Sequence, residues 1–419
     1  MINDGKMRQE ILTHLSDARQ LENLYRGNKI AFKREFRALY PDLKASIIAD
    51  FWNERLRSEQ EEVSWGTGRD LIMIVVAALL AGFIAKIPQL FSLNTEFFYT
   101  RNIGFIVFPV LTAYFAWKNR LSSAKIVILV AATLAALIYI NYLPDLKKSD
   151  TLVLSCMHLL PFLWSVMGFA FVGTRENTER RLDYLKFNGD LIIMTGLILI
   201  GGGILTAITI NLFMLIGLHI EEFYMQNIGI FGLAAAPIIG TYLVQNNPQL
   251  VGRVSPVIAR LFSPLVLVML LVYLVAIAYS GKNPYNDRDF LIIFNILLVG
   301  VLAIIFFSVA ETSKSGNQNL ETWVLLGLSF VTIVVNGVAL SAILYRITEW
   351  GITPNRMAVL GANLLVLLNL ILVAFQLYRV AAKKTNISGV GQVIGFFLPV
   401  YALWTLIVTF LFPFIFGFK

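Results

Sequence analysis

The sequence predicts an all-α integral membrane protein with about eleven transmembrane helices in tandem parallel repeats and a small N-terminal cytosolic helical segment. Composition, long hydrophobic segments and an internal repeat lead to this fold class. Hydrophobic residues make up 57% of the 419 positions, charged residues make up 14%, and the mean hydropathy is +0.72. Soluble domains have about 45–50% apolar and roughly 25% charged residues. The composition therefore excludes an ordinary soluble enzyme, a disordered chain and a fibrous repeat.

The N-terminal segment differs in charge from the rest of the chain. Residues 1–69 contain 12 Lys and Arg and 11 Asp and Glu, whereas residues 70–419 contain 22 and 15. This change places a domain boundary at Asp70. Helices are predicted over 7–26, 29–40 and 43–60, with Pro41 separating the last two, and their apolar stripes favour a small bundle. A basic amphipathic helix on the inner leaflet and a head that docks a protein partner are the alternatives.

The membrane part is predicted from continuous apolar segments of about 20 residues, the length that crosses a bilayer as a helix. The eleven predicted spans are 70–91, 102–117, 124–143, 151–173, 190–217, 227–245, 257–279, 289–309, 321–344, 356–378 and 389–416. Strands are not expected, because the segments are continuously apolar and do not alternate.

The orientation follows from the charges of the loops. With the N-terminus inside, the loops after the second, fourth, sixth, eighth and tenth spans contain eleven Lys and Arg, and fewer lie in the loops on the other side. Positive residues concentrate in cytoplasmic loops. We therefore expect a multi-pass protein with a cytoplasmic N-terminus.

An internal repeat divides the spans into groups of four, four and three. The segment Glu96-Phe-Phe-Tyr-Thr-Arg-Asn102-Ile-Gly returns as Glu221-Glu-Phe-Tyr-Met-Gln-Asn227-Ile-Gly, and a weaker copy runs from Glu349 to Asn355. The predicted units are 70–175, 176–312 and 313–419, the last being incomplete. Four spans cross the membrane an even number of times, so the copies are parallel and the three Glu–Asn segments should lie on one face, the outer one.

These segments contain the predicted site residues, for which two interpretations stay open. The asparagines can cap the helices that follow them, because an N-cap side chain accepts a free main-chain N–H. Alternatively, the acids and amides form a polar outer vestibule that binds a cation or a headgroup. An ionisable residue within a span is a candidate functional residue. The candidate residues are Glu96, Asn102, Glu221, Asn227, Glu349, Asn355, Lys86 and Arg346.

One segment resembles a known family. The string Tyr345-Arg-Ile-Thr-Glu-Trp-Gly-Ile-Thr-Pro-Asn-Arg356 and the stretch that begins at Asn102 resemble a bacterial polytopic membrane family catalogued as domain of unknown function 4153. The resemblance covers roughly residues 70–419. It implies a bacterial inner-membrane protein and carries no established activity.

Catalytic and cofactor motifs are missing from the sequence. Cys156 is the single cysteine, and the three histidines are far apart. No zinc-binding spacing, P-loop or nucleophile elbow occurs. We therefore predict no metal and no cofactor, and the absence of a long basic tract argues against nucleic acid as a partner. Membrane lipids, and a possible cytosolic protein bound at residues 1–69, are the predicted partners.

Three classes of function remain. A transporter of a small solute, ion or lipid explains the span count, the repeats, the glycine run Gly201–Gly203 and the asparagines within spans, and is favoured. An assembly or sensory protein would use the N-terminal segment to dock a partner. A membrane-embedded transferase acting on a lipid would need an acid as base or metal ligand. The sequence favours a protein that is not an enzyme.

Overall fold

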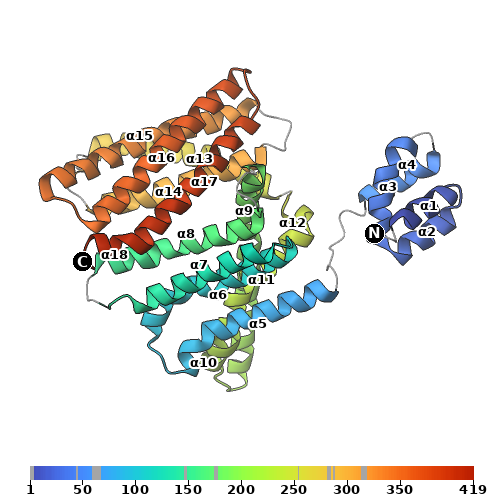
Figure 1. Cartoon of the computed structure of the whole chain (residues 1–419), viewed down its shortest axis with the longest axis horizontal. Coiled ribbons are helices and arrows are strands. Elements are labelled where there is room, and N and C mark those ends of the chain that lie inside the picture. Colours follow the sequence, from blue (N-terminus) through green and yellow to red (C-terminus); the bar gives the residue numbers. More distant parts are fainter. Residues whose placement is uncertain are drawn as a thin grey trace. The chain divides into compact units, whose positions relative to one another are not determined.

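The protein consists of two compact helical units, residues Met1–Ser64 and Trp65–Lys419. The structure is a computed structural model that describes residues 4–43, 46–58, 68–145, 149–173, 178–252, 254–280, 285, 288–312 and 319–419. All regular secondary structure in these residues is helical (Figure 1). The predicted repeat boundary at 175–176 lies outside the described residues. The boundary at 312–313 lies directly after the described range 288–312.

The described residues of the N-terminal unit form a bundle of four helices. They are α1 (Asp4–Thr13), α2 (Ala18–Gly27), α3 (Lys29–Leu43) and α4 (Ile47–Ser58). The predicted apolar stripes pack against one another around the ring of Trp52, whose centroid lies 5.1 Å from that of Phe32 and 6.4 Å from that of Phe36. Aromatic pairs at such distances add to the stability that burial provides.

Two predicted boundaries in this unit are wrong. The helix expected over 7–26 is two helices, because the Asp17 carboxylate accepts the main-chain N–H groups of Arg19 and Gln20 and so starts α2. Pro41 lies inside the last turn of α3 and does not separate two helices. The chain leaves the helix only after Leu43, so Pro41 removes one hydrogen bond without ending the helix where it stands.

The second unit contains the predicted apolar segments. Its helices are α5 (Gly68–Leu90), α6 (Thr95–Lys118), α7 (Ser123–Tyr142), α8 (Asp150–Val172), α9 (Thr178–Leu215), α10 (Glu221–Tyr224) with the π-helical turn η2 (Met225–Gly229), α11 (Ile230–Asn246), α12 (Pro248–Gly252), α13 (Val254–Ser280), α14 (Arg288–Thr312), α15 (Asn319–Trp350), α16 (Pro354–Ala381), α17 (Ser388–Leu406) with η3 (Ile407–Leu411), and α18 (Phe412–Ile415).

Ten helical segments in the described residues are long and apolar enough to cross a membrane, which is typical of a multi-pass membrane protein. The predicted second span, now α6, is not among them. This helix carries the buried polar residues Arg101 and Asn102 and packs most extensively against α8. Other helices cover much of α6, so it needs less apolar character than a helix that faces lipid.

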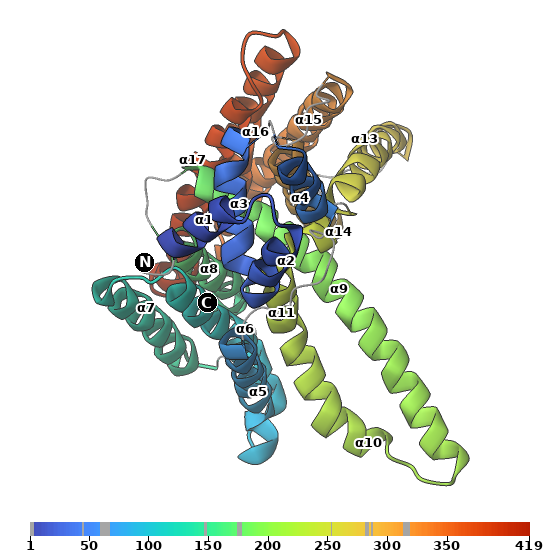
Figure 2. The same ribbon diagram turned by 90° about the vertical axis from the view of Figure 1, so that its right-hand side faces the viewer.

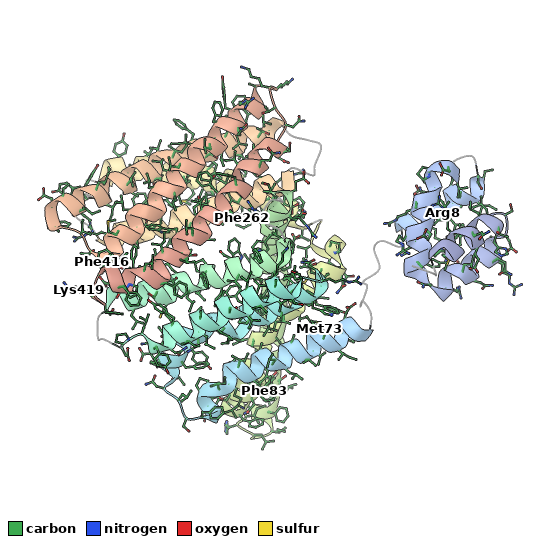
Figure 3. All side chains as sticks on the ribbon, in the orientation of Figure 1. Arg8, Met73, Phe83, Phe262, Phe416 and Lys419 are labelled. Carbon is green, nitrogen blue, oxygen red and sulfur yellow. The ribbon has the colours of Figure 1, made fainter. Side chains whose placement is uncertain are left out.

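The helices of this unit form two groups, each with its own core. One core lies among α5–α8 and α11, and the other lies among α13–α17. The first half of α9 lies between them. Its second half is largely exposed, and Figure 2 shows it diverging from α11 on the way to the turn at α10. Large apolar side chains, including Phe83 and Phe262, are exposed on the outside of the unit, as expected for a surface that faces lipid (Figure 3).

The second half of α9 contains the glycine run Gly201–Gly203. The helix continues unbroken through the three glycines, and no atom lies within 4 Å of a Cβ built on any of them. They therefore mark neither a break nor a close helix contact within this chain.

The two ends of the unit are named after Lys419 and Asp70. The Lys419 end contains the α5–α6, α7–α8 and α15–α16 turns and α18. The starts of α8 and α16 meet α18 there, because Leu154, Ala358 and Phe412 pack together. The Asp70 end contains the start of α5 and the opposite ends of the same helices. The second helices of the three predicted repeats have different main neighbours: α6 packs against α8, α11 against α5, and α16 against α15.

Candidate ligand cavity at the Asp70 end

A large cavity of the second unit lies at the Asp70 end, between helices far apart in sequence. It has a volume of about 1230 Å³ and is called the main cavity below. Its walls come from the starts of α7, α9 and α17 and from the ends of α8 and α16. Ligand pockets in proteins commonly measure about 300–1,000 Å³, so the main cavity can hold a molecule of at least that size.

The main cavity has a polar layer and an apolar layer. On α7, α16 and α17 a polar residue near the Asp70 end is followed, about one helical turn toward the middle, by an apolar residue. The pairs are Lys125 and Ile128, Gln376 and Leu372, and Gln392 and Phe396. The end of α8 repeats the pattern, since Gly173 lies in the polar layer and Phe169 lies one turn deeper. Residues three or four apart share a helix face, so these polar and apolar residues line the cavity together.

Two charged side chains belong to the polar layer. The ammonium group of Lys125 donates to the main-chain oxygen of Gly173, which ends α8 in the left-handed conformation with φ of 74°. Glu179 stands in the first turn of α9 and is exposed to the cavity. A cation beside helix carbonyls and an acid beside free helix N–H groups are both favourable placements.

The first three turns of α9 connect the main cavity to the rest of the unit. Arg181 donates to the main-chain oxygen of Gly395 on α17 over 3.1 Å. Eight residues after Thr178, Lys186 pairs with Glu311 of α14 at 2.7 Å. Residues 178–190 thus contact α17 on one side and α14 on the other. The sequence indicated a cytosolic loop here, with the span beginning at 190.

A second, smaller cavity of about 240 Å³ lies among α13, α14 and α15. Arg260 and Glu321, which form an ion pair, and Glu311 line it, and the hydroxyls of Ser263 and Ser308 hydrogen-bond at 2.8 Å. The side chain of Glu311 is only 4% exposed. A carboxylate so deeply buried requires its cationic partner, because an unpaired buried charge is very costly.

A third cavity of about 550 Å³ is lined by residues of α5, α6, α7 and α11, among them Asp70 and Lys118. The Lys118 ammonium donates to the Oε1 of Gln245 over 2.9 Å. These three cavities thus lie at the ends of the spans that the sequence predicted to face the cytoplasm.

The predicted site residues lie at the Lys419 end, and the structure does not gather them into one site. Lys86 of α5 donates to the side-chain oxygen of Asn227 in η2. The second Glu–Asn segment therefore lies beside the end of α5, and the first Glu–Asn segment follows that end in the chain. Lys86 therefore contacts an amide of η2. The other candidates lie elsewhere at this end: Glu96 and Glu349 are exposed, Glu221 lies 3.6 Å from His219, and Asn355 is half-buried in the first turn of α16.

The capping interpretation of the three asparagines is wrong. The residues that precede α6, α10 and α16 are Asn94, Ile220 and Thr353, and the Asn94 and Thr353 side chains accept main-chain N–H groups. Asn102 lies two turns inside α6, where its amide and that of Asn141 exchange hydrogen bonds of 2.9 and 2.8 Å. The sequence placed the span at its most apolar stretch, so the polar first turns were assigned to loops.

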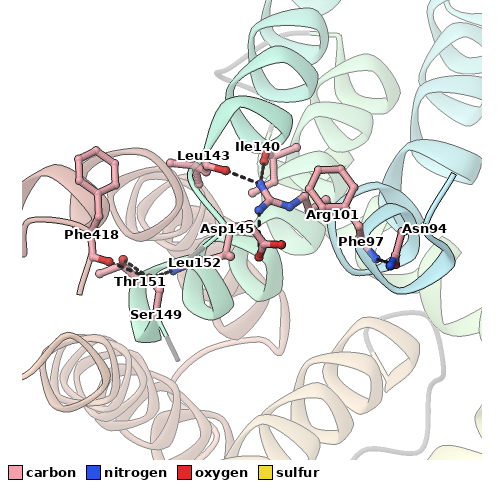
Figure 4. Close-up of polar contacts among 10 residues, drawn as sticks. All are labelled: Asn94, Phe97, Arg101, Ile140, Leu143, Asp145, Ser149, Thr151, Leu152 and Phe418. Carbon is pink, nitrogen blue, oxygen red and sulfur yellow. Dashed lines mark hydrogen bonds and ion pairs between the residues drawn. The ribbon is translucent and has the colours of Figure 1, made fainter. Parts of the chain in front are cut away.

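Sequence analysis missed Arg101, the most completely buried cation at this end (Figure 4). It is 3% exposed and donates to the main-chain oxygens of Ile140 and Leu143 over 2.6 and 2.8 Å, with Asp145 at 3.7 Å. These oxygens belong to the last turn of α7, where helix carbonyls have no helical partner. Arg346 has a related role, since its Nε donates to the main-chain oxygen of Tyr285 over 2.9 Å.

The described residues contain no group of three or more His, Cys, Asp and Glu side chains placed to hold a metal ion. Comparison of the chain with protein-family models, curated proteins and solved structures found no match.

Proposed function

We propose that the protein binds an amphipathic molecule in the main cavity and moves it within or across the membrane, as a transporter does. The two-layer lining carries this proposal. Polar side chains at the Asp70 end suit a polar head, and the apolar residues one turn deeper suit a hydrocarbon tail. A site lined by charge alone would fit a solute or ion better than this arrangement does.

The proposed membrane orientation agrees with this lining. With a cytoplasmic N-terminus, the Asp70 end lies at the inner surface of a bacterial inner membrane, and the polar layer faces the headgroups. The surplus of Lys and Arg in the loops at this end supports the orientation. The resemblance to domain of unknown function 4153 supports the same compartment and stays a proposal.

The tandem arrangement of four, four and three spans is likewise proposed. The hydrogen bond between Lys86 and Asn227 supports it, because parallel copies put both Glu–Asn segments at one end. In this arrangement the main cavity lies between the first repeat, which supplies α7 and α8, and the third, which supplies α16 and α17. A site between repeats is common among transporters.

The proposal is tested by measuring the thermal stability of the purified protein against a panel of amphiphiles, soluble metabolites and ions. A ligand that binds only the folded state raises the melting temperature. We expect amphiphiles to stabilise the protein and the Leu372→Trp variant, which fills the apolar layer, to lose that stabilisation.

Leu368→Trp is the matched control. Leu368 lies one turn before Leu372 on α16 and does not line the main cavity. Its side chain is 46% exposed, against 44% for Leu372. Stabilisation by metabolites alone, or an equal effect of both variants, would contradict the proposed function.

One observation favours the alternative of an assembly or sensory protein. Ile47 and Phe51 lie one turn apart on α4 of the N-terminal unit and are 74% and 73% exposed. Adjacent exposed apolar residues mark interaction surfaces. If docking is the main role, Ile47→Ser with Phe51→Ser abolishes function while Leu372→Trp leaves it intact.

A further inference from the structure

The charged side chains of the polar layer indicate which charges the head of the ligand has. Among the residues that the structure describes, the layer contains one cation, Lys125 of α7, and one anion, Glu179 of α9, together with the amides of Gln376 and Gln392. The two charged residues come from different helices, and the amides can donate or accept hydrogen bonds. The described side chains of the layer therefore offer one positive and one negative group.

Each charged side chain keeps capacity for a ligand. The Lys125 ammonium has three N–H donors, of which one is used by the main-chain oxygen of Gly173. The carboxylate of Glu179 is exposed and lies in the first turn of α9, whose free N–H groups favour its negative charge. Both residues line the main cavity, so each group is accessible to a molecule bound there.

Heads of different charge fit this layer unequally. An anionic head pairs with Lys125 and faces the carboxylate of Glu179. A cationic head pairs with Glu179 and faces Lys125. A head that carries both charges pairs with both residues, and such pairing is stronger at the edge of an apolar region than in water.

We propose that the main cavity selects an amphiphile whose head carries one positive and one negative group, and that zwitterionic phospholipids belong to this class. This inference rests on the proposed function of the main cavity and specifies the chemistry of its ligand. The negative group of the head pairs with Lys125 and its positive group with Glu179. The acyl chains lie against Leu372, Phe396 and the other residues of the apolar layer.

The test compares three lipids with identical short acyl chains: phosphatidylcholine, which is zwitterionic, phosphatidylglycerol, which is anionic, and a cationic diacyl trimethylammonium lipid. Each is titrated into the purified full-length protein, and the melting temperature gives its apparent affinity. We expect phosphatidylcholine to bind about tenfold more tightly than either singly charged lipid.

Charge variants then change the order of preference. Glu179→Gln, which alters an exposed side chain, should weaken phosphatidylcholine binding about fivefold and make phosphatidylglycerol the preferred lipid. Lys125→Gln should favour the cationic lipid. Glu222→Gln, which removes an exposed acid from α10, is the control and should leave the order unchanged.

The outcomes separate the two proposals. Equal stabilisation by all three heads, a preference for one singly charged head, or an unchanged order in Glu179→Gln would overturn the headgroup inference and leave the cavity as an amphiphile site. Stabilisation by none of the lipids would overturn the proposed function itself.

Discussion

The two ends of the membrane unit use polar residues in different ways. At the Lys419 end, Arg101, Ser149 and Asn102 bind main-chain oxygens or another amide of the chain directly. At the Asp70 end, charged and amide side chains line three cavities. Polar groups that are fully paired inside a protein fasten helices together, whereas those that line a cavity remain available to a ligand. Substitutions of polar residues that bind other parts of the chain should therefore reduce stability, and substitutions of those that are exposed in a cavity should alter ligand binding.

The largest effect is expected for Arg101→Ala. The substitution leaves the oxygens of Ile140 and Leu143 without their charged donor, and two such hydrogen bonds contribute about 3–5 kcal/mol to the free energy of unfolding. Arg356→Ala, which removes exposed hydrogen bonds to Trp350 and Gly351, is the control and should cost less than about 1 kcal/mol. Chemical unfolding in mixed micelles measures both. If Arg101→Ala kept wild-type stability and lost lipid binding, the division between the two ends would fail.

A smaller loss is expected for Glu311→Ala at the Asp70 end. It leaves Lys186 without its partner in a largely buried position, at a cost of about 3 kcal/mol. Replacing both residues, as in Lys186→Met with Glu311→Leu, should recover most of that stability, because a buried pair contributes little beyond an apolar pair. The same unfolding measurement applies. A double variant as unstable as Glu311→Ala would show that other groups depend on this pair.

The amide pair at the Lys419 end should have a coupling energy of about 1 kcal/mol. Asn102→Ala, Asn141→Ala and the double variant form a double-mutant cycle, and the two amides exchange two hydrogen bonds that each single variant breaks. Unfolding free energies of the four proteins give the coupling. A coupling of zero would mean that the pair does not fasten α6 to α7.

The smallest effect is expected in the N-terminal unit, where the stability contribution of an ion pair near water can be compared with that of the buried pairs. A hydrogen bond from Arg26, followed by one from Arg55, lowers the pKa of Glu22 below its ordinary value of 4.5. A carboxylate with a depressed folded pKa stabilises the unit above the unfolded pKa, and this contribution is lost as the pH falls through the folded pKa. It should amount to less than about 1 kcal/mol.

Hydrogen exchange of α2 and α4 at pH 7 and below pH 4 measures this contribution in the full chain. Glu22→Gln should reduce the difference between the two conditions, and Asp42→Asn, at an exposed position of α3, serves as its control. Weaker protection of α2 and α4 at pH 7 than below pH 4 would contradict this prediction.

Much of the helical order could be predicted from the sequence. Every predicted span lies within or overlaps a helix, because about 20 continuous apolar residues have few alternatives to a helix. The start of α9 escaped prediction, since the charges of residues 178–190 resemble a loop. The buried Tyr184, Phe187 and Leu191, at intervals of three and four, were the signal that a helix begins earlier.

The candidate site could be predicted far less well. Repetition drew attention to the Glu–Asn segments, yet a repeated residue need not face its copies. The main cavity is assembled from α7, α8, α9, α16 and α17, and its alternation of polar and apolar residues becomes visible only when these helices lie together. Nothing in the sequence near Arg101 identifies its main-chain partners Ile140 and Leu143, which are 39 and 42 residues further along the chain.

Photo-crosslinking tests most directly whether an amphiphile occupies the main cavity. The protein is illuminated with a phospholipid that carries a photoreactive group in its acyl chain, and the labelled peptides are identified by mass spectrometry. We predict that labelling concentrates around Leu372 and Phe396, is competed by unlabelled phosphatidylcholine and disappears in Leu372→Trp but not in Leu368→Trp. Labelling spread evenly over lipid-facing helices such as α13, and unchanged in Leu372→Trp, would contradict it.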